Sequence, residues 1–327
     1  MSDDRTDIRR HLLRDGDVSV AILSLGCVTQ DWRVPLNGNR VPVVLGYSDP
    51  GAYRHNPFFM GAIVGRVANR ISGAGFDLLG QRCNLDVNEA PHHLHGGKGG
   101  LHAQNWDMEP DGDRKVILRR ASRSGDQGYP GAVEFVVAIS LQGPRLRYDM
   151  LATVDRPTPI NLAQHSYYNL MGRGPVHDHN LTLAARAVTL TGAGMIPTGD
   201  VVALDGQPFD LRWGGRLGKA DPQRAGLDLN FVLNPDKAAA TLRAPNGLHL
   251  TLATDQPCLQ IFTAPNLRQS FQPLADQAHV AFGGICLEPQ GYPDAPNRPE
   301  CPSIIVTPDH PYHQRLDVTI AAQGGAA

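Results

Sequence analysis

Short runs in which apolar and polar residues alternate recur along the chain, and they constrain its fold more than any other feature. In VEFVVAISL every second residue from Phe135 to Leu141 is apolar, and in RLRYDMLATV the same holds from Leu146 to Ala152. A period of two places alternate side chains on opposite faces of a β-strand. One polar face and one apolar face are typical of antiparallel sheets with one side buried. The sequence therefore predicts an all-β fold.

Frequent turn signals separate these runs. The chain has 35 glycines and 26 prolines, and the dipeptide Asn246-Gly247 stands between two alternating segments. Asn-Gly favours a two-residue type I′ hairpin, because both residues tolerate positive φ. No long segment has helical periodicity, and neither a repeat nor a low-complexity linker divides the chain. We therefore expect one large antiparallel β-sandwich.

Composition excludes several classes of protein. The net charge is −2 and the pI about 6.7, so no basic surface for nucleic acid is expected. The N-terminus lacks the apolar core of a secretory signal, and no window approaches the roughly 18 apolar residues of a membrane helix. The cysteines lack CxxC spacing, which predicts free thiols and a cytoplasmic location. These cysteines are Cys27, Cys83, Cys258, Cys286 and Cys301.

Glu288 is the most informative single residue. It follows the apolar run HVAFGGICL and precedes the turn sequence PQGYP, so we expect it at the end of a buried strand. An unpaired charge there costs several kcal/mol, so such a carboxylate is either paired or functional. Far upstream, His165 lies in NLAQHSYYNL, where it is either a core histidine or a functional one. Together the two residues could form an acid–base pair.

Two arginines follow apolar stretches in GAIVGRVANRISG. On a strand Arg66 and Arg70 would share one face, and Asn69 would point to the other. They are either structural, as a solvated face or an ion pair, or donors for hydroxyl oxygens of a ligand.

A cluster of histidines occupies NEAPHHLHGGKGGLHAQNW. His93 and His95 would share a strand face, with His92 and His102 nearby and Trp106 following. The cluster has neither HExxH nor Cys-rich spacing, so no metal is expected. The remaining interpretations are a loop of surface histidines, or one imidazole that enters a pocket beside the glycines.

Two further polar residues, Asp228 in GLDLNFVL and Gln260 in LQIFTAPN, adjoin apolar strands. Each alone could be a turn residue. Combined with the arginines, amides, histidines and Glu288, and with Trp and Tyr for aromatic surface, they suit a carbohydrate site, which needs fixed partners for hydroxyls. No phosphate-binding glycine motif and no GxSxG motif is present.

Five segments, in order, resemble the aldose 1-epimerase (galactose mutarotase) family. They are GRVANRI, HLHGG with a downstream Trp, HSYYNL, GLDLNF and CLEPQGYPDAPN. The resemblance runs from about residue 15 to 318, which implies one β-sandwich domain over 1–327 with its core in that range. It also implies an isomerase that interconverts the α and β anomers of an aldose such as galactose or glucose, with no cofactor and no metal.

The resemblance implies a role for each candidate residue. Glu288 matches the family's general base and His165 its general acid. The matching substrate-binding positions are Arg70, Asn69, His95, Asp228 and Gln260. The chain departs from the family pattern at Leu229, where histidine is more frequent, and at Tyr168, where phenylalanine is. Both departures bear on which sugar is preferred.

The chemistry suits these residues, and two rival functions stay open. Ring opening removes a proton from the C1 hydroxyl and delivers one to the ring oxygen, which a carboxylate and an imidazolium can do. A hexose-6-phosphate 1-epimerase would need a basic cluster, for which Arg66, Arg70 and Arg268 are candidates. A noncatalytic sugar-binding module would not need both His165 and Glu288. The expected partner is a small monosaccharide, and the sequence indicates no oligomeric state.

Overall fold

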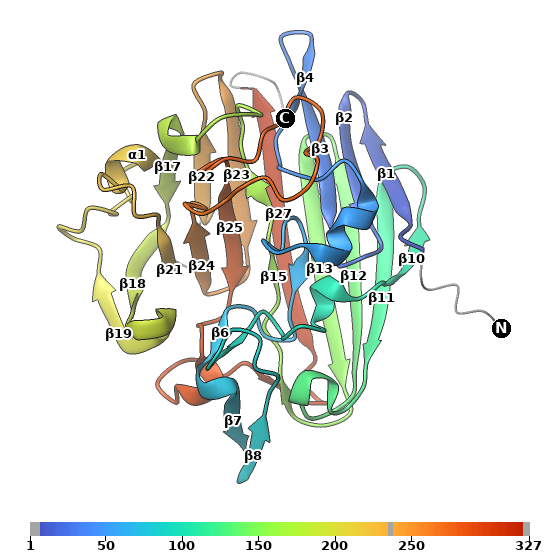
Figure 1. Ribbon diagram of the computed structural model, residues 1–327, viewed down its shortest axis with the longest axis vertical. Coiled ribbons are helices and arrows are strands. Elements are labelled where there is room, and N and C mark those ends of the chain that lie inside the picture. The colour runs from blue at the N-terminus through green and yellow to red at the C-terminus, as the bar shows by residue number, and fades with distance from the viewer. Residues whose placement is uncertain (1–6, 235–237, 323–327) are drawn as a thin grey trace.

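Two large antiparallel sheets face each other across the centre of the molecule (Figure 1). The computed structural model describes residues 7–234 and 238–322. Every multi-residue strand pair in these ranges is antiparallel. The predicted all-β antiparallel sandwich is therefore confirmed. No helix in these ranges is long and apolar enough to cross a membrane.

The larger sheet has nine strands. In spatial order they are β10 (Asp107–Pro110), β11 (Lys115–Ser122), β12 (Val133–Gln142), β13 (Arg145–Val154), β27 (Tyr312–Ala322), β23 (Leu248–Thr254), β22 (Ala240–Arg243), β17 (Asn180–Leu183) and β20 (Gly215–Arg216). The alternation predicted for β12 and β13 is confirmed, because Phe135, Val137, Tyr148 and Met150 are all fully buried.

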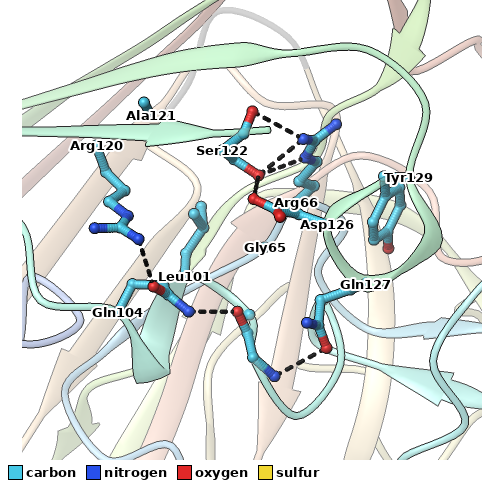
Figure 2. Close-up of a pocket in the computed structure, with 13 residues that line it drawn as sticks. Gly65, Arg66, Leu101, Gln104, Arg120, Ala121, Ser122, Asp126, Gln127 and Tyr129 are labelled. Atoms are coloured by element: carbon cyan, nitrogen blue, oxygen red, sulfur yellow. Dashed lines mark hydrogen bonds between the residues drawn. The ribbon is translucent and has the colours of Figure 1, made fainter. Parts of the chain in front are cut away.

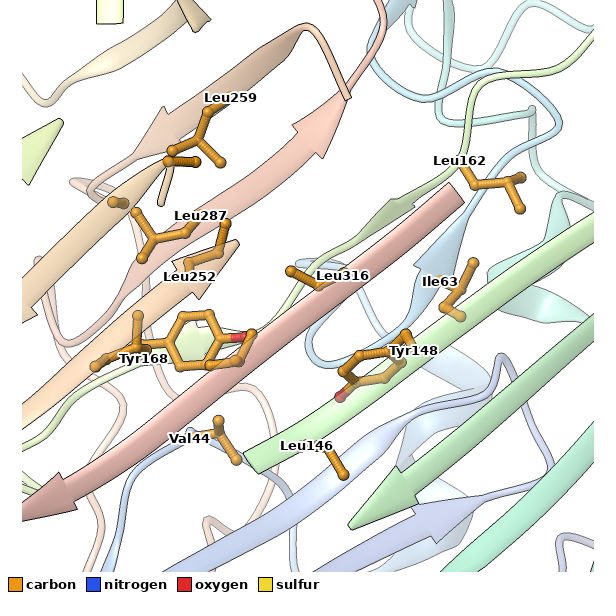
Figure 3. Packing of buried hydrophobic residues seen from close by; sticks show 14 of the residues in the cluster. Val44, Ile63, Leu146, Tyr148, Leu162, Tyr168, Leu252, Leu259, Leu287 and Leu316 are labelled. Atoms are coloured by element: carbon orange, nitrogen blue, oxygen red, sulfur yellow. The ribbon is translucent and has the colours of Figure 1, made fainter. Parts of the chain in front are cut away.

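The smaller sheet has six strands and carries three of the candidate site residues, Asp228, Gln260 and Glu288. In spatial order they are β16 (Tyr167–Tyr168), β25 (Ile285–Gln290), β24 (Cys258–Phe262), β21 (Asp228–Leu233), β18 (Ala185–Thr191) and β19 (Pro197–Ala203). Leu259 and Leu287 of this sheet share one buried cluster with Leu252 and Leu316 of the larger sheet (Figure 3). Burying each leucine stabilises the fold by about 1.5–3 kcal/mol. The opposite face of the smaller sheet is thus left for polar residues.

Smaller elements complete the fold. A four-stranded sheet contains β1 (Arg10–Asp15), β2 (Val18–Leu23), β3 (Thr29–Leu36) and β4 (Asn39–Pro42). Two-stranded pairs are β5 (Ile63–Val64) with β15 (Ala163–Gln164), β6 (Arg70–Ile71) with β9 (His93–Leu94), β7 (Gly75–Leu78) with β8 (Gln81–Asn84), and β14 (Thr158–Pro159) with β26 (Ile305–Val306). The helices are α1 (Leu217–Ala220) and the 3-10 turns η2 (Pro50–His55), η3 (Ser72–Ala74), η4 (Leu101–Ala103), η5 (Asp126–Gly128), η6 (Val176–Asp178), η7 (Ala193–Met195) and η8 (Ala295–Asn297).

The hairpin between β22 and β23 exists, but its predicted turn type is wrong. Gly247 has φ of 90°, whereas Asn246 is not among the residues with positive φ. The Gly247 N–H donates to the carbonyl of Ala244 at 3.1 Å, which defines a three-residue loop. Pro245 explains the difference, since its fixed φ suits the first central position of a type I turn followed by a left-handed glycine.

Candidate active site

The register of the smaller sheet aligns the polar candidates on one face. Glu288 on β25 pairs with Gln260 on β24. On β21, Asp228 pairs with Phe262, two residues beyond Gln260 on β24. Because side chains alternate along a strand, Glu288 and Gln260 point away from the leucines that enter the core. Glu288 lies within β25 rather than at its end, because the strand begins only at Ile285 and continues to Gln290.

A cavity of about 160 Å³ opens over this face. It is lined by every residue of the predicted site: Glu288, His165, Arg70, Asn69, His95, Asp228 and Gln260. The remaining lining residues are Pro57, Phe58, Phe59, Leu94, Tyr167 and Phe262. Residues from the whole length of the chain therefore meet in one place.

Glu288 and His165 lie together at the buried end of this cavity. Glu288 is 2% exposed and His165 5% exposed. The Nε2 atom of His165 is 3.7 Å from the Oε2 atom of Glu288, and its Nδ1 atom is 3.5 Å from the thiol of Cys286. The backbone of His165 is fixed by hydrogen bonds, its N–H donating to Ala62 and its carbonyl accepting from Gly61. A proton donor and acceptor are thus held side by side.

Burial drives both members of this pair toward their neutral forms. Loss of solvent, reinforced by the negative charge of Asp228, raises the pKa of Glu288 well above its usual value. Loss of solvent also lowers the pKa of His165 to about 4. Both shifts favour the neutral carboxyl and the neutral imidazole over the ion pair.

A chain of hydrogen bonds orients the amides. Asn69 Nδ2 donates to Gln260 Oε1 at 3.3 Å, and Gln260 Nε2 donates to Asp228 Oδ1. The backbone N–H of Asn69 donates to Nδ1 of His95 at 3.1 Å. Burial lowers the pKa of His95 well below its usual value, so its proton is on Nε2. His95 thus provides a neutral N–H donor to the cavity.

Arg70 enters the cavity as a paired cation. Its Nε and Nη2 atoms donate to the two carboxylate oxygens of Glu89 at 2.5 and 2.8 Å. Such bidentate pairing fixes the plane of the guanidinium. Loss of solvent raises the pKa of Asp228, and the positive charge of Arg70 partly offsets this rise.

The aromatic wall was only partly predicted. Phe59 is packed against three imidazoles, with ring centroids 4.8 Å from His95, 4.8 Å from His102 and 6.0 Å from His165. It belongs to the loop sequence HNPFF, whose neighbouring aromatic residues within a turn were the available signal. The predicted Trp106 is absent from this wall. It lies in the core, where its indole N–H donates to Leu101.

The prediction that Arg66 and Arg70 share a face is wrong. The chain between β5 and β6 is not a strand, since Gly65 and Asn69 have φ of 156° and 61°. Arg66 enters a separate cavity of about 120 Å³. There its three nitrogens donate to the hydroxyl and carbonyl of Ser122 (Figure 2). They also donate to the backbone carbonyls of residues 123, 130 and 131. Arg66 is a structural residue.

The expectation that His93 and His95 share a strand face is also wrong. His93 is buried beside Tyr129, whose hydroxyl is 2.8 Å from its Nε2 atom. The chain then turns at His95, which has φ of 49°, and only His95 enters the cavity. Gly96 fixes this turn, because a Cβ atom there would lie 1.8 Å from the carbonyl oxygen of Gly65.

The fold and the cavity define a β-sandwich protein with a buried acid–base pair among polar groups suited to hydroxyls. The family model described as aldose 1-epimerase matches residues 9–319. The chain belongs to the aldose 1-epimerase family.

Relatives and solved structures agree with this assignment. The chain is 34% identical to galactose mutarotase of Rattus norvegicus over 315 residues, covering 94% of this chain and 92% of that one. It is 30% identical to aldose 1-epimerase of Escherichia coli strain K12, covering 89% and 88%. An aldose epimerase homologue from C. elegans superimposes with a TM-score of 0.92 at 24% identity, covering 97% and 99%. At 24% identity, the similarity to the C. elegans structure shows a shared fold.

Proposed function

We propose that this protein interconverts the α and β anomers of a free aldose, with Glu288 as general base and His165 as general acid. The observation that carries the proposal is the 3.7 Å approach of these two buried groups in a cavity lined by hydroxyl-binding side chains. The names of the relatives, galactose mutarotase and aldose 1-epimerase, support the same reaction.

The reaction needs two proton transfers in each direction. The Glu288 carboxylate takes the proton of the C1 hydroxyl while the His165 imidazolium protonates the ring oxygen, and the C1–O5 bond breaks. The open-chain aldehyde rotates about C1–C2. On closure Glu288 returns its proton to the C1 oxygen, and His165 takes the proton of the attacking hydroxyl. Both groups end as they began, so the reaction consumes nothing.

Burial favours the forms that the pair has in the middle of this reaction. Once the ring has opened, Glu288 carries the proton and His165 is neutral, and loss of solvent shifts the pKa of each residue toward that form. The carboxylate–imidazolium arrangement holds the same number of protons.

The other polar residues bind the sugar. Gln260 and Asn69 have their amides fixed by the hydrogen-bond chain to Asp228, and His95 offers its Nε2 proton. Prealigned donors and acceptors lower the entropic cost of holding a polyhydroxylated ligand. Phe58, Phe59 and Phe262 supply apolar surface for its C–H groups.

The three arginines considered for a phosphate do not form a cluster. Arg66 lies in the separate cavity and is saturated by backbone carbonyls. Arg70 is paired with Glu89, and Arg268 is exposed, with its guanidinium carbon 5.6 Å from the ring centre of Phe58. A free aldose therefore suits the cavity better than a hexose 6-phosphate.

We place the protein in the cytoplasm. All five cysteines are free thiols, three of them buried. Free thiols are typical of a reducing compartment.

Polarimetry with freshly dissolved α anomers tests the function. We expect purified protein to accelerate the change in optical rotation of α-D-galactose or α-D-glucose well beyond the spontaneous rate. A panel of aldoses and the matching 6-phosphates, read by NMR of the anomeric protons, identifies the preferred substrate. Acceleration confined to the phosphates, or absent for every sugar, would reject the proposal.

A further inference from the structure

A thiol lies where the acid and the base meet. Cys286 is two residues before Glu288 on β25, and is completely buried. Its Sγ atom is 3.5 Å from Nδ1 of His165. Within residues 7–234 and 238–322, the ligand atoms of His165, Cys286 and Glu288 form a group whose members all lie within 4.8 Å of one another. The proton-transfer steps above do not use this thiol.

We propose that His165, Cys286 and Glu288 form an inhibitory site for a soft divalent cation, represented by Zn²⁺. The cation would occupy the acid and the base at once and so exclude the sugar from the chemistry. The inhibition rests on the proposed function, whereas the binding does not.

The geometry is close to that of a zinc site. Bond lengths of about 2.0–2.3 Å in a tetrahedral site place ligand atoms about 3.3–3.6 Å apart. The thiol is 3.5 Å from one ring nitrogen of His165 and the carboxylate is 3.7 Å from the other. A cation can bind only one of the two ring nitrogens. The three ligand atoms lie within 4.8 Å of one another, so the longest distance between them must shorten for all three to bind one cation. The shortening that a tetrahedral site requires is about 1 Å.

Charge balance favours the complex. Zn²⁺ bound to a thiolate, a carboxylate and a neutral imidazole has no net charge, so no uncompensated charge is buried. Two protons leave on binding, one from the Cys286 thiol and one from the Glu288–His165 pair. The neutral imidazole that zinc requires is the form that burial already favours at His165.

The ligand set also predicts selectivity. Thiolate and imidazole ligands favour Zn²⁺, whereas Mg²⁺ requires oxygen ligands in octahedral geometry. Cys258 provides a matched control, because it is a buried thiol on the adjacent strand β24 that belongs to a cluster with Val232 and Tyr292. It is not part of the three-residue ligand group.

The test measures binding and inhibition separately. Co²⁺ is titrated into the full-length protein and into the variants Cys286→Ser and Cys258→Ser, and the thiolate-to-cobalt charge-transfer absorption is recorded in the near ultraviolet. Zn²⁺ displacement of Co²⁺ gives its affinity. We expect the band in wild type and Cys258→Ser and its loss in Cys286→Ser, with Zn²⁺ affinity reduced about tenfold or more, equal to about 1.4 kcal/mol of lost coordination. Circular dichroism confirms folding, and Cys286→Ala serves if the serine variant does not fold.

Inhibition is then measured on whatever activity each variant retains. Zn²⁺ should inhibit wild type competitively with the sugar, Mg²⁺ at the same concentration should not, and the residual activity of Cys286→Ser should have lost zinc sensitivity. Absence of the charge-transfer band in wild type, or its persistence in Cys286→Ser, would overturn the site. A band without competitive inhibition would overturn the inhibitory role alone. A protein that binds Co²⁺ in this way but has no epimerase activity would reject the function and leave the metal site standing.

Discussion

Two cavities adjoin residues 65–70, and each is lined by one of the two arginines in that range. In the first, Arg66 donates to Ser122 (Figure 2) and to carbonyls of the surrounding loops, which together satisfy all its nitrogens. In the second cavity, Arg70 is paired with Glu89. Glu288 and His165 are both buried there, and their nearest nitrogen and oxygen atoms are 3.7 Å apart. In the first cavity the charged group has hydrogen-bond partners for all its nitrogens. In the second, two titratable groups line the space that a ligand could occupy.

The contrast shows that polar burial alone does not mark a functional site. Burial with complete hydrogen bonding stabilises a fold, since a saturated guanidinium holds several loops at once. Loss of solvent shifts pKa values in both cavities, since it lowers the pKa of Arg66 to about 10 and raises that of Glu288. Only the second cavity brings a carboxyl and an imidazole within 3.7 Å of each other. Shifted groups converging on a cavity are typical of catalytic sites. The predictions below test this division.

The largest expected effect is at Glu288. Glu288→Gln keeps the shape of the side chain but removes the base, and should lower kcat about 10² to 10⁴-fold. Asp126→Asn is the control from the Arg66 cavity, where Asp126 accepts hydrogen bonds from Ser122 and Arg123, and its kcat should be unchanged. Steady-state polarimetry on folded protein measures both. Near-normal turnover of Glu288→Gln would remove Glu288 from the mechanism.

Within the second cavity, the acid and the binding residues should separate kinetically. His165→Asn should lower kcat more than it changes KM, because its proton is needed mainly as the ring bond breaks. Asp228→Ala should instead raise KM, since its proposed role is to bind the sugar and orient Gln260. Full progress curves over a range of sugar concentrations distinguish the two. The reverse pattern would show that the roles are wrongly divided.

Arg66→Met tests the first cavity. It removes the Arg66 hydrogen bonds to the buried carbonyls of residues 122 and 131, and removing one partner of such a network costs about 3 kcal/mol or more. We expect a lower urea midpoint with kcat per folded molecule unchanged. Loss of kcat at full stability would mean that Arg66 acts in the reaction.

The pH dependence of kcat/KM should be a bell set by the proton count of the Glu288–His165 pair. A lowered histidine pKa means that the second proton enters only as pH falls toward about 4. A raised carboxyl pKa means that the first proton leaves at a pH well above the usual range of a glutamate. Both limbs belong to the coupled pair. In Glu288→Gln the remaining activity needs only the protonated His165, so its acid limb should disappear, and an acid limb that survives unchanged would be assigned to another group.

The smallest expected effect is that of chelation. The proton transfers need no Lewis acid, so dialysis against EDTA should leave activity unchanged, or raise it where trace zinc occupied the three-ligand site. Elemental analysis accompanies the assay. Activity that falls on chelation and returns with stoichiometric zinc would contradict both the mechanism and the inhibitory role of the metal.

The long strands could be predicted from the sequence because their apolar side chains recur with a period of two. Every second residue of β12 and β13 is apolar, and these residues are the buried ones. The same rule failed between residues 65 and 70 and between 93 and 95. There the backbone enters the left-handed region at Asn69 and His95, which is rare for residues with a side chain and gives no periodic signal.

The residues of the candidate site were identified by a different route. Their positions beside apolar, strand-like runs singled out Glu288, His165 and Gln260, and the motif resemblance implied their roles. The structure places all three around one cavity. Phe59 and Cys286 were missed because neither residue type signals a site by itself. Their positions depend on tertiary contacts, the first on its packing against His95 and His165 and the second on the register of β25 with β16.

The position of β27 has a consequence for synthesis of the chain. β27 lies between β13 and β23 and is the link between the two halves of the nine-stranded sheet (Figure 1). From Val154, the end of β13, to Tyr312, the start of β27, translation at about 5–20 residues per second takes about 8–32 s. Throughout that time the edge of β13 waits for β27 to cover it, and open edges promote association between chains. The edges of this sheet are therefore more exposed during synthesis on the ribosome than in the folded protein.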